Sequence, residues 1–79
     1  MIRKKDILNI MGSRCPDSII KIRIKINKIK NGDLIFVISD DQTTKYEIPR
    51  FCTFMNHILL LTIYKSNIYK FLIQKKIIE

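Results

Sequence analysis

The chain contains few of the residues from which metal centres and hydrolytic sites are built. Its 79 residues include one histidine and two cysteines, and Cys15 and Cys52 are far apart, without a Cys-x-x-Cys pair. A structural zinc site needs four ligands, and a cysteine hydrolase needs a histidine that exchanges protons with its thiol. The sequence therefore predicts no metal site and no bound cofactor.

Long apolar segments are also missing. The longest, His57 to Tyr64, is much shorter than the roughly 18 residues that a membrane-spanning helix needs. The basic start at residues 1–5 is typical of a signal peptide, but Asp6 and Asn9 interrupt the segment and no apolar stretch follows. We expect a cytoplasmic protein without membrane contact, monomeric when free, whose cysteines stay reduced thiols.

Alanine and tryptophan are absent, whereas isoleucine, lysine and asparagine are abundant. A formal net charge of +8 ordinarily indicates a nucleic acid or an anionic surface as partner. The same lysines are expected from AT-rich coding, so compositional drift explains them at least as simply. A small basic nucleic-acid-binding module is therefore retained as an alternative function.

A chain this short buries only about 60% of its unfolded surface, so residues 1–79 are expected to form a single domain. Periodicity and turn residues divide it into six segments. They predict strands at 6–11, 33–39, 57–65 and 68–76 and helices at 16–30 and 43–56. The order βαβαββ predicts an α+β fold, a two-layer α/β sandwich with two helices packed on one face of a four-stranded mixed sheet.

The segment after Pro16 fits two patterns. Isoleucine alternates with polar residues from Ile20 to Ile26, as in a strand, but a helix places a second set of isoleucines on one face: Ile19, Ile22, Ile26 and Ile29. Pro16 and Asp17 suit a helix start, so the helix is favoured and Ile20 is expected to lie off the core face. In the second helix Pro49 is expected to kink or delay the start.

Cys15 is the candidate reactive residue. It is expected at the carboxyl end of the first strand, at the N-cap of the first helix, where free N–H groups, the helix dipole and adjacent Arg14 favour a thiolate. The carboxylate of Asp17 opposes this effect. His57 is expected at the opposite edge of the sheet, which argues against a hydrolase, and the absence of a resolving cysteine nearby argues against a disulfide reductase. Sulfur transfer through a persulfide remains. Cys52 is expected in the core.

Three stretches carry a resemblance to a known family: "SRCPDSIIKIRIKI", "DLIFVISDDQTTKYEIPRFCTFMNHILL" and "YKFLIQK". Together they resemble the TusA family of SirA-like sulfur carriers. The resemblance implies a fold similar to the C-terminal domain of translation initiation factor three. It also implies a sulfurtransferase that accepts persulfide sulfur from the PLP-dependent cysteine desulfurase IscS and passes it to the TusBCD complex for 2-thiouridine in tRNA. A route to molybdenum cofactor is the alternative.

The family's Cys-Pro-x-Pro motif carries over to Cys15 as the persulfide-forming nucleophile and to Pro16. Its second cysteine falls on Cys52, which is not the transferring thiol. The second motif proline is replaced by Ser18. This change restores an N–H that is expected to point toward the Cys15 sulfur.

Partner contacts are predicted from placement alone. Acidic residues follow the second strand at the edge where Cys15 is expected, and basic and apolar residues lie on or beside the helices. The predicted partner-facing residues, with Arg14 beside the thiol, are Ile20, Arg23, Asp40, Asp41 and Phe54.

Overall fold

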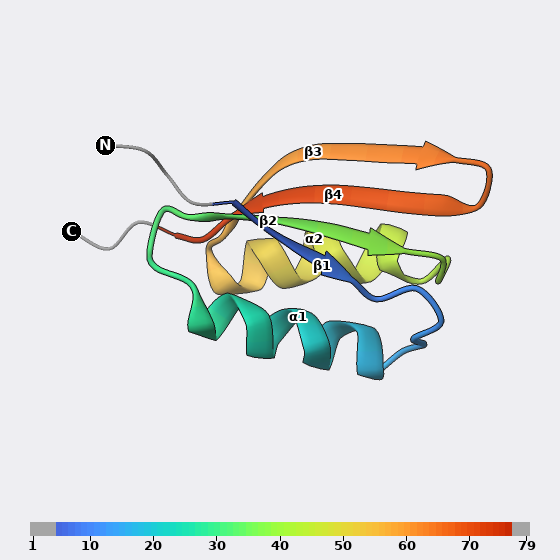
Figure 1. The fold of residues 1–79 in the computed structure, drawn as a ribbon, viewed down its shortest axis with the longest axis horizontal. Coiled ribbons are helices and arrows are strands. Elements are labelled where there is room, and N and C mark those ends of the chain that lie inside the picture. The colour runs from blue at the N-terminus through green and yellow to red at the C-terminus, as the bar shows by residue number, and fades with distance from the viewer. Residues whose placement is uncertain (1–4, 77–79) are drawn as a thin grey trace.

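The computed structural model describes residues 5–76, and most of the basic start of the chain lies outside them. Figure 1 shows a sheet covered on one side by two helices, in the predicted order βαβαββ. The elements are β1 (Lys5–Asn9), α1 (Asp17–Lys28), β2 (Leu34–Ser39), α2 (Thr44–Met55), β3 (Ile58–Lys65) and β4 (Ile68–Gln74). The predicted two-layer α+β sandwich is confirmed. In the described part of the chain, no helix is long and apolar enough to cross a membrane.

The segment that fitted both a strand and a helix is α1. Ile22 and Ile26 are buried at 0% and 2% exposure, whereas Ile20 is 49% exposed, so the helical stripe decides the conformation. The helix is shorter than predicted at both ends. Pro16 is its N-cap, and Ile29 is already extended, with φ −91° and ψ 163°. Ile29 leaves the helix and still places its side chain in the core, so α1 ends before the Asn31-Gly32 turn.

Pro49 lies inside α2, so the predicted delay of this helix was wrong. The start is fixed earlier by contacts of Asp41. The hydroxyl of Thr44 donates to the Asp41 carbonyl at 2.6 Å, and the N–H of Thr43 donates to the Asp41 carboxylate at 3.0 Å. Because Pro49 removes only one N–H from the helix and its fixed φ suits a helix, burial of Ile48 and Phe51 outweighs the loss.

The sheet order is β1-β2-β4-β3. β1 and β2 are parallel, which is the unit expected from strand, helix, strand, and the other neighbours are antiparallel. The predicted β3–β4 hairpin turns at Ser66 and Asn67, both with positive φ (53° and 63°). A two-residue hairpin turn of this handedness matches the twist of the strands, and asparagine accepts the left-handed region readily.

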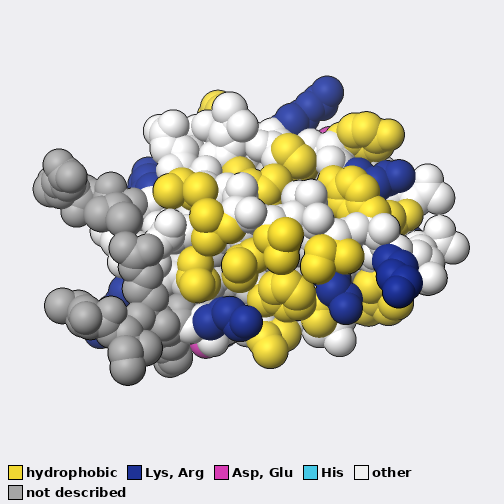
Figure 2. Space-filling view, turned by 90° about the horizontal axis from the view of Figure 1, so that it is seen from above, with side chains coloured by type: hydrophobic (Ala, Val, Ile, Leu, Met, Phe, Trp, Pro, Cys, Tyr) yellow, Lys and Arg dark blue, Asp and Glu magenta, His cyan; other side chains and the backbone are white. Residues whose placement is uncertain are grey.

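The core lies only between the sheet and the helices. The inner row of sheet side chains is fully buried: Ile35, Val37, Phe71 and Ile73. The opposite face of the sheet carries no covering layer among residues 5–76, and Figure 2 shows it as a broad apolar surface interspersed with basic side chains. The carboxyl ends of the parallel pair β1 and β2 meet at one end of the sheet, and both connections that leave there lead to a helix.

The buried His57 makes folding stability depend on pH. Its Nδ1 accepts the Lys76 N–H at 3.0 Å, its Nε2 has no partner among the described residues, and it is 8% exposed. Burial, followed by the positive charges of Lys76 and Lys75, lowers the pKa of His57 below its ordinary value of 6.5. The unfolded chain therefore binds a proton at a higher pH than the folded chain does.

We predict that the free energy of unfolding is constant well above the ordinary histidine pKa of 6.5 and falls as the pH drops through that value toward the lowered pKa of the folded His57. Urea titrations at several pH values measure this. His57→Asn, which keeps an acceptor for the Lys76 N–H but cannot titrate, should remove most of the dependence. Equal slopes in the two proteins would show that another group is responsible.

Candidate functional site

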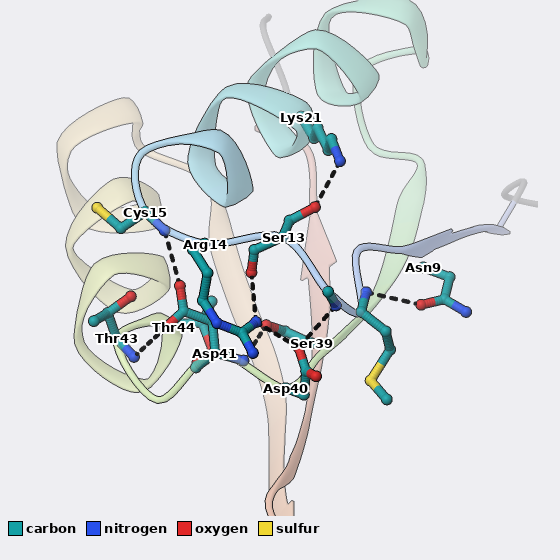
Figure 3. Close-up of polar contacts among 12 residues, drawn as sticks. Asn9, Ser13, Arg14, Cys15, Lys21, Ser39, Asp40, Asp41, Thr43 and Thr44 are labelled. Carbon is teal, nitrogen blue, oxygen red and sulfur yellow. Dashed lines mark hydrogen bonds and ion pairs between the residues drawn. The ribbon is translucent and has the colours of Figure 1, made fainter.

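The loop that joins β1 to α1 carries Cys15, which is exposed. The loop begins with a turn at Gly12, whose φ of +87° is a conformation that glycine adopts without strain. In Figure 3 the sulfur of Cys15 points away from the neighbouring carboxylates and from the loop after β2. The thiol is therefore presented at the surface on a short connection between two regular elements.

Asp41 holds this loop in place from the other connection. One carboxylate oxygen accepts the Cys15 N–H at 3.0 Å, and the other accepts the Thr43 N–H at 3.0 Å. Asp41 is 5% exposed, and its own N–H donates to the Ser39 hydroxyl at 3.0 Å. Burial alone would raise the pKa of Asp41, but the hydrogen bonds from Thr43 and Cys15 and the charge of Arg14 together lower it. The carboxylate therefore stays ionised while it fixes the Cys15 backbone.

Asp40 makes a second link on the exposed side. Its Oδ1 accepts the Gly12 N–H at 2.9 Å and an N–H of the Arg14 guanidinium at 2.9 Å. The hydrogen bond from Gly12, followed by the one from Arg14, lowers the pKa of Asp40. The contact with Asp40 in turn raises the pKa of Arg14. Two successive aspartates after β2 thus hold both ends of the Gly12–Cys15 segment.

The structure corrects two details of the predicted site. Cys15 precedes the N-cap, which is Pro16, and the peptide bond between them is cis. The first-turn N–H groups of Asp17 and Ser18 both donate to the Arg14 carbonyl, at 2.7 Å and 3.3 Å, so neither points to the sulfur. The Arg14 guanidinium forms an ion pair with Asp40 at 2.9 Å.

Ser18, the residue in place of the motif proline, is buried at 1% exposure. Its hydroxyl has no hydrogen-bond partner within residues 5–76. Leaving a buried hydroxyl unsatisfied costs stability, so this position of α1 is not optimised for serine. Ser18 therefore has a structural role, on the buried side of the first turn of α1.

The other two residues with reactive side chains are remote from this loop or inert. Cys52 is 2% exposed, and burial raises its pKa to about 11. His57 precedes β3, whose first residue is in register with Gln74 and through it with Leu34 at the start of β2. Cys15 follows the carboxyl ends of β1 and β2, so His57 lies at the other end of the sheet, as predicted, and does not serve this thiol.

Four of the five predicted partner-facing residues divide into two groups, and the fifth, Asp40, pairs with Arg14. Ile20 (49% exposed), Arg23 and Phe54 (79% exposed) lie on the outer surface of the helical layer. Arg23 sits over the Phe51 ring at 5.9 Å, and Phe54 lines a shallow apolar pocket with Pro49. Asp41, in contrast, is buried with both oxygens occupied by N–H groups, and the structure gives it an internal role in place of the predicted partner contact.

Two further contacts at the site were also missed by the sequence analysis. The Lys21 ammonium donates to the Ser13 hydroxyl at 2.6 Å, which ties the loop to α1. The Asp41-to-Thr43 contact is a turn in which an aspartate accepts the N–H two residues on, and the sequence "DDQTT" carried a signal for it. Neither contact adds a catalytic group. No cluster of metal-ligating residues exists in the part of the chain that the structure describes.

Comparisons with known proteins agree with this geometry. The family model described as "Sulfurtransferase TusA" matches residues 6–75. One similar protein is the sulfur carrier protein TusA of Buchnera aphidicola subsp. Baizongia pistaciae (strain Bp). It is 47% identical to this chain over 70 residues, which cover 89% of each of the two proteins. Residues 6–75, which the family model matches, include every residue of the site.

We predict that Asp41→Asn loosens the Cys15 loop and lowers the free energy of unfolding by about 1–3 kcal/mol, because one buried acceptor is replaced by a donor facing an N–H. Amide hydrogen exchange should become faster at Cys15, and urea unfolding should give the stability change. Asp17→Asn, on the exposed first turn of α1, is the matched control. Unchanged exchange at Cys15 in the Asp41 variant would contradict the internal role.

Ser18→Ala should raise the free energy of unfolding by about 1 kcal/mol, because it removes a buried hydroxyl that lacks a partner. Chemical denaturation measures the change. Ser13→Ala is the comparison, since that hydroxyl accepts a hydrogen bond from Lys21 and its removal should not stabilise the protein. A destabilised Ser18→Ala variant would mean that the hydroxyl is satisfied in solution.

Proposed function

The chain belongs to the TusA family of sulfurtransferases, and from this premise we propose that it carries sulfur as a persulfide on Cys15. The observation that supports the residue is the exposed thiol on a loop fixed by the carboxylates of Asp40 and Asp41. A sulfur carrier must present its thiol to two different proteins in turn, first to the donor of the sulfur and then to the acceptor. An exposed side chain on a fixed backbone meets that need, because the reacting atom is reachable and the loop pays little ordering entropy at each encounter.

The transfer step is an exchange between thiols. The Cys15 thiolate attacks the outer sulfur of a donor cysteine persulfide, a new S–S bond forms, and the S–S bond within the donor breaks. The donor cysteine leaves as a thiolate, and the proton released by Cys15 passes to solvent or to that leaving group. Delivery is the same exchange with the roles reversed: an acceptor thiolate attacks the outer sulfur of the Cys15 persulfide, and Cys15 leaves as a thiolate. Neither step needs an oxidant or a bound cofactor.

Cys52 is unsuited to this work. Its thiol is buried in the core, and burial raises its pKa to about 11, so near neutral pH it remains protonated and out of reach. Its contribution is to packing between α2 and the sheet. A persulfide formed on the protein should therefore reside on Cys15 alone.

We further propose the cysteine desulfurase IscS as donor and the TusBCD complex as acceptor, with 2-thiouridine in tRNA as the final product. The proposed donor contact uses Ile20, Arg23 and Phe54, which lie exposed on the helical layer. The sulfur would then reach tRNA only indirectly, since this chain transfers it to a protein. Delivery toward molybdenum cofactor would use the same thiol and differ only in the acceptor.

We predict that one sulfur atom is added to the wild-type chain, and to Cys52→Ser, on incubation with a PLP-loaded cysteine desulfurase and L-cysteine. Cys15→Ser should gain none, because it lacks the exposed thiol. Intact-mass spectrometry before and after a reductant measures the addition, and the reductant should remove it. Sulfur on the Cys15 variant would place the reactive thiol elsewhere.

The same samples separate the alternative functions. If no variant is loaded, a salt-sensitive gel shift with tRNA that persists in Cys15→Ser would support the basic nucleic-acid-binding module instead. If Cys15 is loaded, transfer to the purified TusBCD complex tests the tRNA route. Loading without such transfer would favour a different acceptor.

A further inference from the structure

The sheet has two edges, and only one of them is protected. β1 forms one edge; it is five residues long and carries Lys5 and Asp6, the latter paired with Lys25 at 3.7 Å. β3 forms the other edge and is the longest strand, with eight residues, Ile58–Lys65. No other segment among residues 5–76 pairs with its outer side, and Figure 1 shows it along the margin of the sheet.

β3 lacks most of the features by which proteins normally block an edge strand; the exceptions are a register shift near its start and a lysine at its last position. Proline, inward-facing charges and covering helices prevent edge pairing, whereas the sequence of β3, "ILLLTIYK", has one charge at its last position. Its apolar side chains are solvent-exposed: Ile58 45%, Leu60 49%, Leu61 46%, Ile63 40% and Tyr64 50%. One irregularity, a register shift between Leu59 and Leu61, leaves the stretch from Leu61 to Lys65 regular.

We propose that β3 pairs with β3 of a second copy of this chain, antiparallel and about a two-fold axis at Ile63, in place of the monomer expected from the sequence. A second copy fits because the partner must supply an extended, apolar strand that completes a row of backbone hydrogen bonds. In this register Ile63 faces its own equivalent, and Thr62 faces Tyr64 of the other copy. A β-branched residue opposite an aromatic one is a favourable cross-strand pair.

The lysine on β3 itself does not prevent this pairing. The two Lys65 residues lie opposite Leu61 of the other copy and four positions from each other, roughly 13 Å at the usual rise of a strand. That separation exceeds the screening length of about 8 Å at physiological salt. Packing the outer faces of two sheets against each other would be different. That face carries Lys5 and Lys70 and no described carboxylate, so lysines would be desolvated without partners.

The proposed dimer is closed and leaves the thiol free. The two-fold contact uses the same strand of both copies, and the second edge, β1, is short and charged, so growth stops at two copies. Cys15 follows β1, at the opposite edge of the sheet from β3. The dimer would expose two thiols and does not depend on the proposed sulfur transfer.

The test is the concentration dependence of association, measured by sedimentation velocity under reducing conditions over about 10 µM to 1 mM, the range for a small interface. Wild type should shift from monomer to dimer. Ile63→Lys, which sets two lysines against each other across the axis, should weaken association by about tenfold or more. Ile7→Lys, an identical change at a 65% exposed residue of β1, is the matched control and should still dimerise.

Cross-linking gives a second measurement should Ile63→Lys fail to fold. In a Cys15→Ser background, Ile63→Cys should form a 63–63 disulfide on mild oxidation, since facing residues of antiparallel strands lie within disulfide range. Ile7→Cys should not cross-link at the same concentration. A wild type that stays monomeric at every concentration overturns the proposal. Equal loss of association in both lysine variants, or equal cross-linking in both cysteine variants, overturns it as well.

Discussion

The fixed position of Cys15 depends on the buried carboxylate of Asp41. One of its oxygens accepts the Cys15 N–H and the other accepts the Thr43 N–H at the start of α2. A single side chain therefore fixes the thiol-bearing loop relative to the second helix. The contact exists because β1 and β2 are parallel, so their carboxyl ends meet and the loops that follow them become neighbours.

Charge at the site is balanced without involving the sulfur. Asp40 takes the guanidinium of Arg14 on the exposed side, and Asp41 is stabilised inside by N–H dipoles. The first-turn N–H groups of Asp17 and Ser18 donate to the Arg14 carbonyl. The loop is thus held together by its own polar groups and presents the thiol on the outside. In the proposed function, discrimination between donor and acceptor would come from surfaces outside this loop, and the helical layer carries exposed apolar and basic side chains.

The sequence predicted what depends on local patterns. Isoleucines at helical spacing identified α1, and Ser66-Asn67 between two apolar runs identified the hairpin. Contacts across the chain were beyond it: Arg14 and Asp40 are 26 positions apart, and nothing local shows that the guanidinium turns to that carboxylate rather than to the thiol. The predicted delay of α2 at Pro49 failed for a related reason, since the cost of one lost hydrogen bond is local whereas the burial of Ile48 and Phe51 comes from the tertiary fold.

The two halves of the sheet work under different constraints. In the parallel half, the thiol loop requires particular carboxylates, a glycine with positive φ and a defined register between β1 and β2. In the antiparallel half, the β3–β4 hairpin needs only an apolar inner face and a turn, and its outer strand contacts nothing at the site. Substitutions on β3 can therefore accumulate without disturbing Cys15. An apolar edge that arises there is kept from unlimited association only by the short, charged β1 strand at the opposite edge.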